Sequence, residues 1–233
     1  MNIIPTAKEM SSSLSQLSHL LYKHEMIEPK SLAHIEPVCV NLRKLGRVKS
    51  WEYTIEPTTP IYFIPIKGKK LPQIAPRIYF DVAVKPPKTD NQPPFSRLVT
   101  VIEVWDVVNK ELQSRWHIDL ANRLEQNIYQ AGPLFHLQGG GHQPQSDRTK
   151  DLKISLPRFP TPPIELILTC ELIIANFYPV QWETLKKQRG WLELIQIAQR
   201  LCYAVYFQRV QNSLAAQQSL LNALWAQEWG KLF

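Results

Sequence analysis

The residues best suited to chemistry lie between Trp116 and His142, a segment with three of the chain's six histidines and three consecutive glycines. If RWHIDL forms a β-strand, its side chains alternate between two faces, and Arg115, His117 and Asp119 share one of them. A histidine between an arginine and a carboxylate can be oriented and its charge tuned near neutral pH. We therefore treat this polar face as a candidate catalytic surface.

A second histidine, His136, lies on the next expected strand, just before the glycines at 139–141. If the two strands pair, His117 and His136 converge near those glycines. Two histidines can provide general acid–base catalysis on a phosphodiester without a metal, with Asp119 orienting one of them and Arg115 neutralising the phosphate. Glycine amides can bind a phosphate or a developing oxyanion. The same residues also suit an ordinary polar sheet face, which is our first interpretation.

The sequence predicts neither a metal ion nor a cofactor. A site built from the histidines would also need His142, across the glycines, and no spacing rule supports that arrangement. The cysteines, Cys39, Cys170 and Cys202, are far apart and form no CxxC pair, so we expect buried thiols in a reducing compartment. The glycines are not followed by GK[ST], and GxGxxG, GxSxG and HExxH are absent.

Positive charge is concentrated in one segment of the chain. The formal net charge is +7, and residues 41–77 hold eight lysines or arginines against two acids, a net of +6. Aromatic residues lie among these cations, and nucleic acid binding by phosphate attraction and base stacking uses both types. Basic loops beside ordinary strands would give the same composition. The residues predicted to bind nucleic acid are Arg43, Lys44, Arg47, Lys49, Trp51, Lys67, Lys69 and Lys70.

Strands are expected in the middle of the chain. The stretches VCVNLR, SWEYTIE, IYFIPI and RIYFDVAV, within residues 38–96, are rich in β-branched and aromatic residues and are broken up by prolines. RLVTVIEVWDV and ELQSRWHIDL flank a candidate turn at Asn109 and Lys110, and GPLFHLQ supplies one more strand. A long loop over 139–160 follows, with a short strand at 152–156.

Helices are expected at both ends of the chain, where apolar residues recur at helical spacing. They cover 6–26, 162–177 with Thr161 as N-cap, 181–189 ended by Gly190, and 191 to about 229 as one helix or two. Segregated strands and helices predict one α+β domain. It would have an antiparallel sheet over about 38–156, an N-terminal helix and a C-terminal helical layer over 161–233.

Three functions are compatible with these features. We favour a non-enzymatic protein that binds RNA or single strands, as an accessory protein or complex subunit. The alternatives are a metal-independent ribonuclease or phosphodiesterase using the histidines, and an interaction protein that docks a partner or a second copy through its C-terminal helices. Those helices carry aromatic residues of the kind enriched at interfaces. They are Trp182, Trp191, Trp225 and Trp229.

A cytoplasmic location is also expected. The first residues lack the basic start and apolar run of a signal peptide. The longest apolar stretch, 164–178, contains Glu165 and Glu171, and it is too short and too charged to span a bilayer. We therefore predict no membrane partner.

Overall fold

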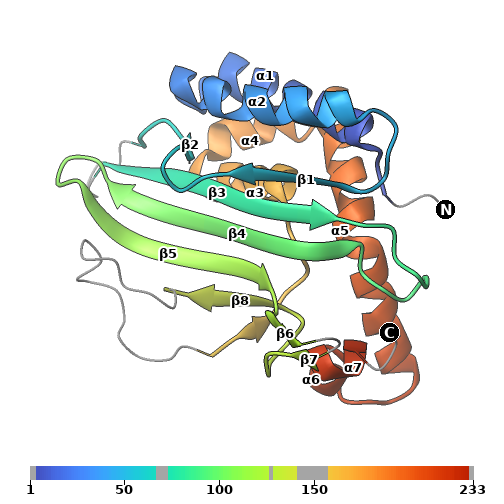
Figure 1. Ribbon diagram of the computed structural model, residues 1–233. Coiled ribbons are helices and arrows are strands. Elements are labelled where there is room, and N and C mark those ends of the chain that lie inside the picture. Colours follow the sequence, from blue (N-terminus) through green and yellow to red (C-terminus); the bar gives the residue numbers. More distant parts are fainter. Residues whose placement is uncertain (1–3, 67–72, 126–127, 141–156, 231–233) are drawn as a thin grey trace.

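A computed structural model describes residues 4–66, 73–125, 128–140 and 157–230 of the chain. An N-terminal helical hairpin and a group of C-terminal helices pack on one side of an antiparallel sheet (Figure 1). In the described residues this sheet has seven strands in the order β1-β3-β4-β5-β8-β9, with β2 also paired to β3. The predicted α+β class is confirmed.

The hairpin consists of α1 (Ala7–Lys23) and α2 (Pro29–Leu45). Thr6 caps α1 in a capping box, because its hydroxyl accepts from Glu9 N at 3.2 Å while its own N donates to the Glu9 carboxylate at 2.7 Å. The strand predicted for VCVNLR is wrong, since residues 38–43 form the end of α2. Its buried residues Ile35, Val38, Cys39 and Leu42 recur every three or four positions, as on a helix.

The long strands form the predicted antiparallel sheet, although it begins at residue 51 rather than 38. Asp106 holds the turn between β4 and β5, because its carboxylate accepts from Val108 N and Asn109 N, each at 3.0 Å. Lys110 completes the turn with φ +55°. The strands of the sheet are β1 (Trp51–Ile55), β2 (Ile61–Tyr62), β3 (Ile74–Val84), β4 (Phe95–Asp106), β5 (Glu111–Leu120), β8 (Phe135–Gly139) and β9 (Phe159–Pro160).

A separate two-stranded ribbon, β6 (Arg123–Glu125) and β7 (Ile128–Tyr129), lies between β5 and β8 in the sequence. It stands beside the end of β5 (Figure 1). The strand expected at 152–156 and the predicted residue His142 lie outside the described residues.

The C-terminal helices begin later than the sequence predicts. Glu165, not Thr161, is the N-cap of the first of them, because its carboxylate accepts from Ile167 N at 2.9 Å and Leu168 N at 3.3 Å. Gly190 does not end a helix but lies in one, where a Cβ would approach Gln16 Nε2 to 2.8 Å. The helices are α3 (Leu166–Phe177), α4 (Pro179–Leu185), α5 (Arg189–Ala215), α6 (Leu220–Ala223) and α7 (Ala226–Gly230).

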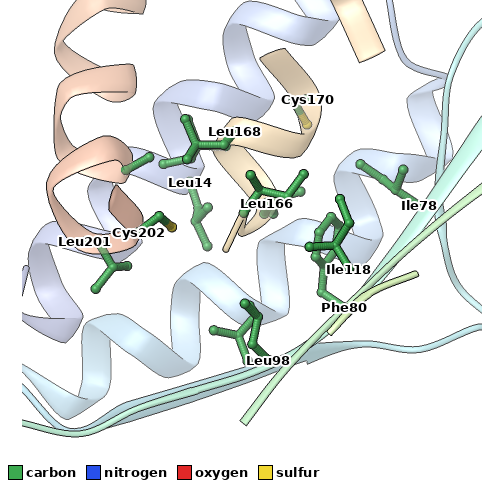
Figure 2. Packing of buried hydrophobic residues seen from close by; sticks show 14 of the residues in the cluster. Leu14, Ile78, Phe80, Leu98, Ile118, Leu166, Leu168, Cys170, Leu201 and Cys202 are labelled. Carbon is green, nitrogen blue, oxygen red and sulfur yellow. The ribbon is translucent and has the colours of Figure 1, made fainter. Parts of the chain in front are cut away.

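The core lies between the sheet and these helices. Alternate residues of β3, β4 and β5 point toward the helices, and their neighbours point to the opposite face. Figure 2 shows Phe80 and Ile118 of the strands, Leu166 and Leu168 of α3 and Leu201 of α5 as members of one buried cluster. The polar residues singled out on β5 therefore lie on the face of the sheet turned away from the core.

Candidate functional site

The register of β5 and β8 brings the predicted catalytic residues together. Asp119 lies opposite His136, and His117 lies opposite Gln138, all on the face turned away from the helices. His117 and His136 are thus diagonal neighbours on adjacent strands, and the Cα atoms of such a pair are typically about 7–8 Å apart. Their nearness follows from the sheet pairing and requires no contribution from the glycines.

Asp119 lies at the centre of this cluster. Its Oδ2 is 3.7 Å from Nδ1 of His117. Burial raises the pKa of the Asp119 carboxyl to about 7, against the opposing effects of the Thr100 backbone and of Arg158 and Arg115. Its Oδ1 is buried and has no hydrogen-bond partner among the described residues. A carboxyl that titrates near neutral pH is suited to accepting and donating a proton.

His136 is poorly placed for the proposed acid–base pair. Its side chain is buried, with 4% of the residue exposed, and Nδ1 lies 3.3 Å from the Pro133 carbonyl oxygen. Burial and the nearby Arg158 lower the pKa of His136 to about 4. The imidazole is therefore neutral at pH 7 and offers little surface to a substrate, so it is not the proton donor that the two-histidine scheme requires.

Arg115 is engaged within the sheet. It donates to the Tyr79 hydroxyl, and its Nε lies 3.7 Å from the Glu103 carboxylate. Glu103 also accepts from Trp105 Nε1 at 2.8 Å. With only 14% of its side chain exposed, the Arg115 guanidinium is positioned by these groups rather than presented to a phosphate.

Arg158 is the cation that sequence reasoning missed. It lies just before β9, donates to the Ala131 carbonyl at 3.1 Å, and approaches Gln138 Oε1 at 3.5 Å. Its charge acts on both Asp119 and His136. No local pattern reveals this role, because it depends on the pairing of β9 with β8.

The second candidate site is the basic hairpin end, defined here as Arg43, Lys44, Arg47 and Lys49. All four side chains are exposed, and within the described residues none forms an ion pair. Backbone bonds fix the loop against the start of α1, since Lys8 N donates to the Gly46 carbonyl and Ala7 N to the Val48 carbonyl, each at 2.8 Å. The loop that carries Arg47 and Lys49 is thus held in place beside the start of α1.

The prediction that Trp51 contacts nucleic acid is wrong. Only 3% of this residue is exposed, and its Nε1 donates to the Pro5 carbonyl at 2.8 Å. The alternation of β1 places Trp51, Tyr53 and Ile55 on the buried face. The indole is part of the core, so it does not stack on a base. Lys67, Lys69 and Lys70, the other predicted contacts, lie outside the described residues.

Two of the four C-terminal tryptophans also belong to the core. Trp191 and Trp229 are buried, whereas Trp182 and Trp225 are half-buried. Trp182 helps line an apolar cleft of about 760 Å³ between α3 and the sheet, to which the exposed Trp116 also contributes. A protein-docking role for these helices stays a prediction.

The comparisons do not assign the chain to a class. No family model, no curated protein and no solved structure matches it. Among the described residues, no helix is long and apolar enough to cross a membrane, and no group of three or more His, Cys, Asp or Glu side chains could hold a metal ion. Cys39, Cys170 and Cys202 are free and buried.

Proposed function

We propose that this protein binds nucleic acid through the phosphate backbone, and that the basic hairpin end is the main contact surface. The observation that supports the proposal is the group of four exposed cations, Arg43, Lys44, Arg47 and Lys49, without ion pairs in the described part of the chain. Cations without an ion pair can neutralise phosphates without breaking a contact in the protein, and each phosphate contact releases condensed counterions.

The protein acts as a binding subunit that does not recognise the base sequence of the nucleic acid. With Trp51 in the core, the hairpin end offers charge but no accessible indole for base stacking. Phosphate contacts position a nucleic acid without reading its sequence. The buried, neutral His136 and the engaged Arg115 favour a non-enzymatic role over the two-histidine nuclease.

Binding of labelled single-stranded RNA, single-stranded DNA and duplex DNA, each at two salt concentrations, tests this proposal. The informative variant is Arg47→Glu/Lys49→Glu. Its matched control is Lys23→Glu/Lys110→Glu, which makes the same change in net charge at exposed positions in other parts of the molecule. We expect salt-sensitive binding that the first variant weakens at least tenfold and the control leaves within about twofold of wild type. Equal weakening by both variants, or no binding at low salt, would refute the proposal.

One observation favours a second candidate function, hydrolysis of the bound nucleic acid. The Asp119 carboxyl has its pKa raised to about 7 and lies 3.7 Å from His117, so these two groups could exchange protons with a substrate. In this scheme Asp119 takes the place of His136. Cleavage that persists in EDTA and disappears in His117→Ala would support it, and intact nucleic acid on a denaturing gel would exclude it.

A further inference from the structure

A second basic feature is a pocket of about 540 Å³ between the loop that follows β3 and the ends of β4 and β5. The β6–β7 ribbon closes one side of it through Arg123 and Tyr129. Among the described residues, its lining includes four cations and no carboxylate. These cations are Lys85, Lys88, Arg97 and Arg123.

The loop that carries Lys85 and Lys88 is ordered by its own hydrogen bonds. Lys85 N donates to the Pro94 carbonyl at 2.8 Å, and Lys88 N donates to the Gln92 side chain at 2.8 Å. Gln92 is itself buried. Four prolines in this loop, at 86, 87, 93 and 94, further restrict the backbone. The backbone that carries the two lysines is thus largely fixed before a ligand binds.

The electrostatics of the pocket favour an anion. Lys85 and Lys88 are exposed and make no ion pair within the described residues. Arg97 is fixed by Asp81 at 2.7 Å and Glu52 at 3.1 Å, two carboxylates that do not line the pocket. The Lys85 and Lys88 ammonium groups are therefore available for a bound anion to neutralise.

The rest of the lining is largely apolar or aromatic, with Gln92, Ser96 and Asn122 as its polar members. Phe95, Leu98, Val99 and Leu120 contribute to it, and the half-buried Tyr129 ring stands with them. An inorganic anion would make no contact with this apolar wall, and a purely apolar molecule would leave the lysine ammonium groups without a partner. Pockets of this size and mixture bind organic ligands with an apolar body and a few fixed polar groups.

We propose that this pocket binds a single nucleotide unit, with the phosphate at Lys85 and Lys88 and the base against Tyr129 and Leu120. The proposal rests on the function proposed above and extends it. Trp51 pairs with Val84, so the loop that ends with Lys49 and the loop that begins with Lys85 leave the sheet at the same end (Figure 1). A strand bound at the basic hairpin end can continue into the pocket.

This arrangement gives the protein a preference for single strands. A base enters the pocket only if it is unstacked and unpaired, and stacking on an aromatic side chain is worth roughly 1–3 kcal/mol per base. The pocket thus supplies the base contact that the buried Trp51 does not.

Titration of the full chain with AMP, adenosine and inorganic phosphate, followed by NMR or calorimetry, tests the proposal. We expect AMP to bind at least tenfold more tightly than either adenosine or phosphate alone. Lys85→Glu/Lys88→Glu should weaken AMP binding at least tenfold, and Tyr129→Leu should weaken AMP binding but not phosphate binding. Melting curves of each variant serve to check that the fold is retained.

A variant of the basic hairpin end distinguishes binding in the pocket from binding at the hairpin. Arg47→Glu/Lys49→Glu should weaken binding of single-stranded RNA but leave AMP binding unchanged, because those residues do not belong to the pocket lining described above. Phosphate binding as tight as AMP would reduce the pocket to an anion site and overturn the proposal. AMP binding that is absent at millimolar concentration, or unaffected by Lys85→Glu/Lys88→Glu, would also overturn it. RNA binding that survives Arg47→Glu/Lys49→Glu while AMP binds the pocket would instead refute the role of the hairpin end.

Discussion

Glu165 makes the stability of this protein depend on pH in an unusual direction. The residue is fully buried at the start of α3, where its carboxylate accepts from the backbone N atoms of Ile167 and Leu168 and lies 3.4 Å from the Tyr53 hydroxyl. Burial raises the pKa of this carboxyl from 4.5 to about 7, more than the hydrogen bonds to it lower it. The folded chain therefore retains a proton that the unfolded chain releases.

The sign and size of the effect follow from proton linkage. Between pH 4.5 and 7 the folded state binds more protons than the unfolded state, so the free energy of unfolding falls as the pH rises. The contribution of Glu165 is fully present below pH 4.5 and is lost as the pH passes 7. At about 1.4 kcal/mol per pKa unit, the loss is about 3 kcal/mol, a large share of the roughly 5–15 kcal/mol typical of folded proteins.

Urea unfolding of wild type and Glu165→Gln between pH 4 and 8 measures this contribution. The glutamine keeps an oxygen for the two backbone N–H groups but cannot titrate. We expect the wild-type free energy of unfolding, relative to the variant, to fall by about 3 kcal/mol across this range. Glu36 is exposed, so Glu36→Gln serves as the control, and its difference from wild type should not show this fall. A wild-type to Glu165→Gln difference that is constant with pH would refute the assignment of the titrating group.

Two further predictions concern other parts of the fold. Asp119→Asn should raise the free energy of unfolding more at pH 8 than at pH 4, because burial raises the pKa of the Asp119 carboxyl and the folded state loses stability when it ionises; equal effects in urea titrations at both pH values would count against this. Thr6→Ala should lower the urea midpoint by an amount equivalent to about 1 kcal/mol, because it removes the side-chain cap of α1; an unchanged midpoint would mean that the cap adds no stability.

The sequence predicted the sheet well where the signal is local. The alternation of RWHIDL and its turn residues located β5, and placed His117 and Asp119 on one face. The same rule, applied to SWEYTIE, places Trp51 with Tyr53 on the buried face. Aromatic composition beside cations was therefore a weaker guide to a binding site than strand alternation.

Other features depend on contacts that are distant in the sequence. The valines and the internal Pro37 of α2 made its second half resemble a strand, although its buried residues have helical spacing. Arg158 reaches Asp119 and His136 only because β9 pairs with β8, and the lowered pKa of His136 follows from burial in the folded chain. No single-sequence pattern carries that information.

The most direct test of the central claim is the salt dependence of single-stranded RNA binding. If all four cations of the basic hairpin end neutralise phosphates, they contribute about −2.8 to the slope of log K against log salt concentration. The quadruple variant Arg43→Glu/Lys44→Glu/Arg47→Glu/Lys49→Glu should lose that contribution and bind weakly even at low salt. A slope and affinity equal to wild type in a folded quadruple variant would contradict the account.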